Sequence, residues 1–156
     1  MFEQFGPDAK GVVAAAMEEA QLRGDRRVGT EHLLLGVLHQ KASPAVEALG
    51  VDLDTARQAL ASLDQAALAA IGIDVQGIER SPVPASRKRT PLSSGARAVF
   101  PRAVAEVRQD RRRRITLEDL LLALLACESP DPAAELLNRL GVDRTAVRER
   151  LRRTGA

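Results

Sequence analysis

Two glutamates, Glu31 and Glu118, stand at the start of two similar leucine-rich stretches and are the first candidates for chemistry. A carboxylate in such a place could bind a ligand. It could equally serve the helix alone, because acidic side chains in a first helical turn are stabilised by the helix dipole. Residue type and position leave both roles open.

The other reactive side chains form no catalytic or metal-binding constellation. His32 and His39 are the only histidines and lack a third ligand for zinc, so His32 is interpreted as structural. Cys127 ends an apolar stretch with no base beside it, which indicates a buried, inert thiol. Neither a Gly-x-Ser-x-Gly elbow nor a Gly-x-x-x-x-Gly-Lys-Ser/Thr phosphate loop occurs. The sequence therefore argues against an enzyme and predicts neither cofactor nor metal.

Basic residues gather in the second half of the chain. Residues 1–79 carry a net charge of −6 and residues 80–156 a net charge of +8. A solvated loop and an anion or partner site both fit the arginine run. Nucleic acid is disfavoured, because stacking needs aromatic side chains and this half offers only Phe100, on a predicted core face. The run consists of Arg111, Arg112, Arg113 and Arg114.

The chain repeats itself once. Val28-Gly-Thr-Glu-His-Leu-Leu-Leu-Gly-Val-Leu38 aligns with Ile115-Thr-Leu-Glu-Asp-Leu-Leu-Leu-Ala-Leu-Leu125, and residues 9–20 align with 96–107 at the same offset of 87. Apolar residues at helical spacing fill both pairs of segments, and Leu and Ala favour helix. A duplication of a four-helix unit explains the pattern. In the first copy the expected helices cover 7–22, Gly29 or Thr30 to about His39, 43–49 and 52–63.

A short motif marks the expected helix junctions: Leu49-Gly-Val-Asp52, Ile71-Gly-Ile-Asp74 and Leu140-Gly-Val-Asp143. Glycine can close a helix in the left-handed conformation, the following Val or Ile enters the core, and Asp caps the next helix. Its second occurrence predicts an extra short helix over 64–71. Prolines and a basic cluster then indicate an exposed linker. We expect repeat 1 over 1–63, the short helix and linker over 64–91, and repeat 2 over 92–156.

The bulk composition suits a protein of the cytoplasm. No apolar stretch is long enough to span a bilayer, and the N-terminus shows no secretory signal pattern. A single cysteine cannot form an internal disulfide, which fits a reducing compartment.

The motif Val28-Gly-Thr-Glu-His-Leu-Leu-Leu-Gly36, with the opening Met1-Phe-Glu-Gln-Phe5, resembles the amino-terminal domain of ClpC-type AAA+ unfoldases, a double Clp repeat. Ile115-Thr-Leu-Glu-Asp-Leu-Leu-Leu122 is a looser copy. The resemblance implies an all-α, pseudo-twofold bundle of two four-helix repeats, about eight helices plus the short linker helix. Because the phosphate loop is missing, we expect a stand-alone binding module.

The resemblance also implies ligands. In ClpC-type domains an acidic residue at the second helix of a repeat holds the guanidinium of phosphoarginine, and Glu31 and Glu118 match that position. The hydroxyl expected for the phosphate is replaced by Gly6 in the first copy and is Ser93 in the second. Cyclic-peptide antibiotics bind relatives at an edge matched by Met1, Phe2 and Glu3, although Leu92 replaces the aromatic expected in the second repeat.

The predicted function is therefore non-catalytic capture of degrons, phosphoarginine or cyclic-peptide antibiotics, as an adaptor or a decoy. Its partners would be Clp protease components or their substrates, with no role for nucleic acid or membrane. The alternative is a regulatory partner that docks on the Clp unfoldase or protease through its basic C-terminal half, without a small ligand.

Overall fold

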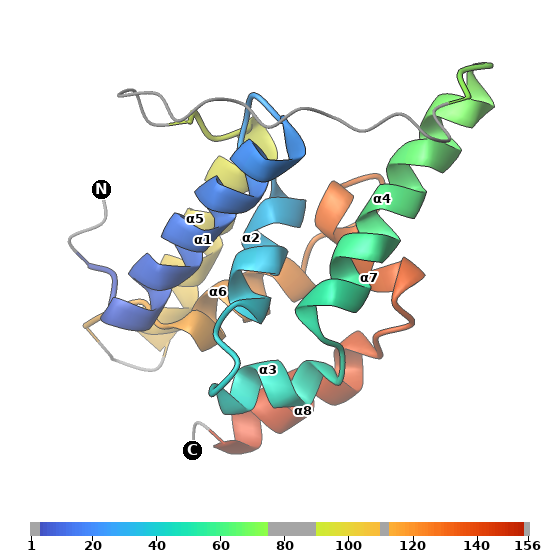
Figure 1. The fold of residues 1–156 in the computed structure, drawn as a ribbon. Helices are drawn as coiled ribbons and strands as arrows, with labels where there is room; N and C mark the ends of the chain where they lie inside the picture. The colour runs from blue at the N-terminus through green and yellow to red at the C-terminus, as the bar shows by residue number, and fades with distance from the viewer. Residues whose placement is uncertain (1–3, 75–89, 110–112, 155–156) are drawn as a thin grey trace.

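The computed structural model describes residues 4–74, 90–109 and 113–154, which form eight helices and no strands (Figure 1). This confirms the all-α fold expected from the Leu- and Ala-rich periodicity. The helices are α1 (Pro7–Arg23), α2 (Thr30–Leu38), α3 (Pro44–Leu49), α4 (Leu53–Ala70), α5 (Ser94–Gln109), α6 (Leu117–Leu125), α7 (Pro132–Arg139) and α8 (Arg144–Thr154).

Helices α2 and α6 lie in the middle of the bundle, as Figure 1 shows. Both are apolar on nearly every face, so the hydrophobic effect favours surrounding them with other helices. Helix α1 packs on α2 and α5 packs on α6, one such pair in each repeat. The outer helices pair across the repeats instead, α3 with α8 and α4 with α7. The two repeats therefore share one hydrophobic core.

Backbone hydrogen bonds join the two repeats in two equivalent places. Gly6 N–H donates to the Ile115 carbonyl at 2.8 Å, and Ser93 N–H donates to the Val28 carbonyl at 2.9 Å. Both partners in the second bond are related to those in the first by the repeat offset of 87. The start of each copy is thus tied to the loop before the central helix of the other copy. This reciprocal pairing is the pseudo-twofold relation in atomic terms.

The glycine motif closes helices as predicted. Gly50, Gly72 and Gly141 have φ of 71°, 86° and 69°, the left-handed region that side chains disfavour. Asp52 and Asp143 then cap α4 and α8, because their carboxylates accept the Thr55 and Ala146 N–H groups at 2.7 and 3.1 Å.

The prediction of a separate helix over 64–71 is wrong. Helix α4 runs unbroken through Leu63 and Asp64, since no glycine or proline interrupts the segment. The Asp64 side chain forms an ion pair with Arg23 of α1 rather than capping a new helix. The second copy of the glycine motif also differs from the others, because Ile73 is 45% exposed instead of entering the core.

Candidate functional site

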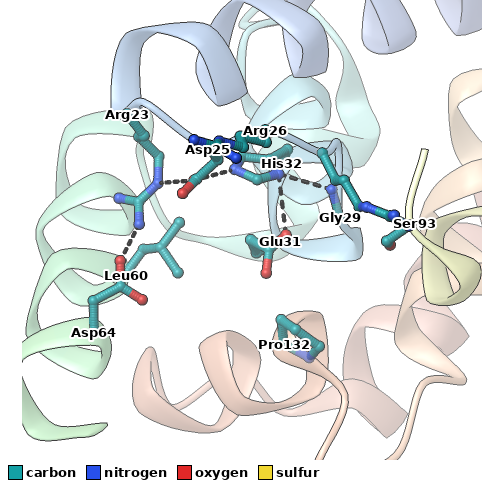
Figure 2. A pocket seen from close by; sticks show the side chains of 11 residues that line it. Arg23, Asp25, Arg26, Gly29, Glu31, His32, Leu60, Asp64, Ser93 and Pro132 are labelled. Atoms are coloured by element: carbon teal, nitrogen blue, oxygen red, sulfur yellow. Dashed lines mark hydrogen bonds and ion pairs between the residues drawn. The ribbon is translucent and has the colours of Figure 1, made fainter. Parts of the chain in front are cut away.

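A pocket of about 410 Å³ opens at the start of α2 (Figure 2). Its walls come from both repeats: the end of α1 and the following loop, the first turn of α2, one face of α4, the residue before α5 and the start of α7. Its polar lining residues are Arg23, Asp25, Arg26, Arg27, Glu31, His32, Asp64 and Ser93. Two residues predicted from the sequence, Glu31 and Ser93, thus line one pocket.

Ser93 and Glu31 belong to different copies, and the backbone hydrogen bonds between the repeats bring them together. Because Ser93 N–H donates to the Val28 carbonyl, the residue before α5 is held beside the loop that precedes α2. Although Ser93 is the hydroxyl of the second copy, it lines the pocket that contains Glu31 of the first copy. Gly6, its counterpart in the first copy, lies beside Ile115, before α6.

The first turn of α2 is left without a side-chain cap. Its N-cap residue, Gly29, has no side chain to accept the amides of that turn, and the His32 side chain accepts only the N–H of Gly29 itself. The Glu31 side chain bends back over Gly29: a Cβ on residue 29 would lie 1.8 Å from Glu31 Oε1. A helix start with open N–H groups attracts anions through both the hydrogen bonds and the helix dipole.

His32 links two of the three acidic side chains of the pocket, Asp25 and Glu31. Its Nε2 lies 2.8 Å from Asp25 Oδ2, and its Nδ1 lies 3.0 Å from Glu31 Oε1 and 2.8 Å from the Gly29 nitrogen. Burial by itself lowers the pKa of His32, but hydrogen bonds and charge interactions with Asp25 and Glu31 outweigh it and raise that pKa to about 8. As imidazolium, His32 adds positive charge; as neutral imidazole, Nδ1 accepts the Gly29 N–H.

The arginines give the pocket its basic side. Arg23 is held by ion pairs, with Asp25 Oδ2 at 3.2 Å and with Asp64. Arg26 and Arg27 lie at the mouth and are exposed to solvent. With the Glu31 carboxylate, only 17% exposed, they place both signs of charge around one cavity. This arrangement suits a ligand that carries a cationic and an anionic group.

Thr30 and Asp131 fasten the pocket to the second repeat. The Thr30 hydroxyl donates to Asp131 Oδ1 at 2.6 Å and accepts the Ala133 N–H of α7 at 3.1 Å. Sequence reasoning missed these two residues and the pocket arginines. A signal for the arginines existed, since Arg26 and Arg27 match Arg113 and Arg114 at the offset of 87.

Glu118 lies in the first turn of α6 and is half-buried, outside this pocket. Thr116 and Asp119 form a capping box there: Thr116 Oγ1 accepts the Asp119 N–H at 3.4 Å, and Asp119 Oδ2 accepts the Thr116 N–H at 2.8 Å. Leu117 N–H donates to Asp8 Oδ2 of α1 at 3.2 Å. The two central helices therefore start in chemically different surroundings.

Other predicted site residues lie apart from the pocket or beyond what is described. Arg113 and Arg114 are exposed before α6. The rest lie outside the described residues: Met1, Phe2, Glu3, Arg111 and Arg112.

The remaining reactive groups take structural places. Cys127 is 3% exposed, and burial, with the nearby Asp131 charge, raises the pKa of its thiol despite Arg102. His39 Nε2 lies 2.7 Å from Glu19 Oε1, and Glu19 also pairs with Arg57. Within residues 4–74, 90–109 and 113–154, no group of three His, Cys, Asp or Glu side chains could hold a metal, and no helix has the length and hydropathy of a membrane span.

Comparison of the sequence with known proteins identifies relatives of this chain. Residues 4–130 match the family described as the Clp repeat (R) N-terminal domain. A probable ATP-dependent Clp protease ATP-binding subunit from Chlamydia pneumoniae is 32% identical over 154 residues, which is 97% of this chain and 16% of that protein. The chloroplastic chaperone protein ClpC of Pisum sativum is 30% identical over 151 residues, 95% of this chain and 15% of the relative. The chain thus spans only 15–16% of these relatives' length.

Solved structures agree with the fold. The N-terminal domain of the caseinolytic protease associated chaperone ClpD from Arabidopsis thaliana has a TM-score of 0.78 and 25% identity, covering 100% of this chain and 97% of that one. The Hsp104 N-terminal domain from Candida albicans, at 16% identity and a TM-score of 0.67, shares the fold. Since the family match covers most of the chain and the whole fold agrees, this chain belongs to the Clp repeat (R) N-terminal domain family.

Proposed function

We propose that this domain is a non-catalytic binding module of the Clp system that captures peptide-like ligands in the pocket at the start of α2. One observation carries the proposal: the pocket combines the Glu31 carboxylate, the Ser93 hydroxyl and the exposed Arg26 and Arg27 around an uncapped helix start. A guanidinium would pair with Glu31. A phosphate would be held by Ser93, the arginines and the α2 amides.

Phosphoarginine carries both groups and is the ligand class that this chemistry favours. Degrons that contain it would be delivered to a Clp protease by an adaptor or withheld by a decoy. Cyclic-peptide antibiotics remain a second proposed ligand, through Met1, Phe2 and Glu3.

Isothermal titration calorimetry with free phosphoarginine tests the proposal. Glu31→Ala should weaken binding at least about tenfold, about 1.4 kcal/mol, because the guanidinium loses its counter-charge. Glu47→Ala is the matched control and should bind normally. It removes an exposed carboxylate on α3, away from the pocket. A cyclomarin-type peptide, titrated into wild type and Phe2→Ala, tests the second ligand.

No heat with either probe, from a folded protein, would contradict ligand capture. The alternative would then gain support: docking on an acidic surface of the Clp unfoldase or protease through the basic half. The exposed Arg113 and Arg114 favour that alternative. Charge reversal there would abolish docking and leave the α2 pocket unchanged.

A further inference from the structure

The start of α6 already holds an anion, and that anion is part of the chain. Asp8, in the first turn of α1, reaches across to α6, where its Oδ2 accepts the Leu117 N–H at 3.2 Å. Its Oδ1 accepts the Ala9 N–H of its own helix at 2.8 Å. Both carboxylate oxygens are engaged, and one of them occupies an amide that a bound phosphate would need.

The equivalent position at α2 carries no such side chain. The repeat offset of 87 relates Asp8 to Gly95 and Leu117 to Thr30. Gly95 lies near Thr30, since a Cβ built on it would be 3.7 Å from Thr30 Cγ2. Asp131 is the carboxylate on this side, and its Oδ1 is bonded to the Thr30 hydroxyl and to the Ala133 amide at the start of α7.

Carboxylates lie near both helix starts, Asp25 and Glu31 at α2 among them, but the charge of the third residue of each helix differs. Around the α6 start lie the carboxylates of Asp8, Glu118 and Asp119, and Asp119 is fully buried. The residue that matches Asp119 in the first repeat is His32, a group that can be cationic. Paired arginines stand before both helices, so they do not distinguish the two starts. The carboxylates oppose a second anion at α6.

We infer that the Asp8 carboxylate is a built-in anion that closes the second pseudo-symmetric site, so that the domain takes a single anionic ligand, at α2. This inference rests on the proposed function for the existence of the α2 site. The duplication therefore gives two similar helix starts of which one binds an external anion and the other an internal one.

Amide NMR resolves the two helix starts separately. We would titrate ¹⁵N-labelled protein with phosphoarginine and, in a second arm, inorganic phosphate. The expected result is saturable shifts of the Thr30 and Glu31 amides, with those of Leu117 and Glu118 unchanged, and a calorimetric stoichiometry of a single ligand per chain. Equal shifts at both helix starts would overturn the inference while supporting the proposed function. No saturable shift at either start would contradict the proposed function itself.

Replacing Asp8 tests its role directly. In Asp8→Ala the Leu117 amide should become responsive to phosphoarginine, and a second, weaker binding event should appear. Asp54→Ala is the matched control, because Asp54 is also the second residue of a helix but lies in α4 and is largely exposed. A Leu117 amide that stays silent in folded Asp8→Ala protein would refute the assignment of Asp8 as the internal anion.

Discussion

His32 couples the charge of the pocket to the stability of the fold. The imidazole is buried, and it faces Asp25, Glu31 and the Gly29 amide at once. Because Asp25 and Glu31 raise its pKa, His32 holds its proton more tightly in the folded chain than in the unfolded one. This single side chain makes the α2 start sensitive to pH near neutrality.

We expect the free energy of unfolding to fall as the pH rises from 6 to 9. The folded-state pKa of about 8 lies above the value of about 6.5 for an unfolded histidine. The stabilisation is thus complete below pH 6.5 and is lost as the pH rises through 8. It amounts to about 2 kcal/mol. Urea unfolding at several pH values measures it.

His32→Gln provides the control, since glutamine can accept the Gly29 N–H as in a capping box but does not titrate. Its unfolding free energy should change less over the same pH interval. An equal fall in wild type and His32→Gln would show that another group is responsible.

At the scale of helices, α1 and α2 approach each other closely at Gly36. Gly36 faces the backbone of α1, and a Cβ on it would lie 2.3 Å from the Val12 carbonyl oxygen. A backbone atom cannot move aside as a side chain can. The two helices can therefore approach this closely only because residue 36 has no side chain, whereas the matching residue in α6 is Ala123.

Gly36→Ala should destabilise the domain by about 1–3 kcal/mol, because the added methyl group forces α1 and α2 apart. Gly11→Ala is the matched comparison. Its Cβ would meet only the end of the Gln40 side chain, at 3.1 Å, and alanine favours helix by about 0.5–1 kcal/mol. Chemical denaturation measures both. Similar destabilisation by the two substitutions would contradict this account of the helix contact.

Local patterns predicted most helices but not how they combine. Periodicity and caps gave the ends of α1 to α3 to within a residue or two. The pattern failed over 64–71, where a further copy of the glycine motif suggested a separate helix although α4 continues through this segment to Ala70. Glu31 and Ser93 were both named from the sequence. Their place in one pocket was not predicted. It depends on the backbone hydrogen bonds between the repeats, which no local pattern encodes.

At the scale of the whole molecule, backbone hydrogen bonds between the repeats join them into one unit. Each copy completes the start of the other through the bonds of Gly6 to Ile115 and of Ser93 to Val28, and α3 packs on α8 and α4 on α7 across the repeats. The pocket inherits this arrangement, since Glu31 and Ser93 come from different copies. Unfolding of either repeat would therefore dismantle the site.

We accordingly expect both repeats to unfold in one cooperative transition. Gly36→Ala offers a sharp test, because its clash lies entirely within the first repeat, between α1 and α2. If the repeats are coupled, the urea midpoints followed by amide signals in α2 and in α6 should decrease together and by the same amount. A fall confined to the α2 signals, with α6 unfolding at the wild-type midpoint, would mean that the repeats fold independently. Such a result would also conflict with the role inferred for Asp8. Asp8 belongs to α1 of the first repeat, so its bond to the Leu117 N–H at the start of α6 requires the first repeat to be folded.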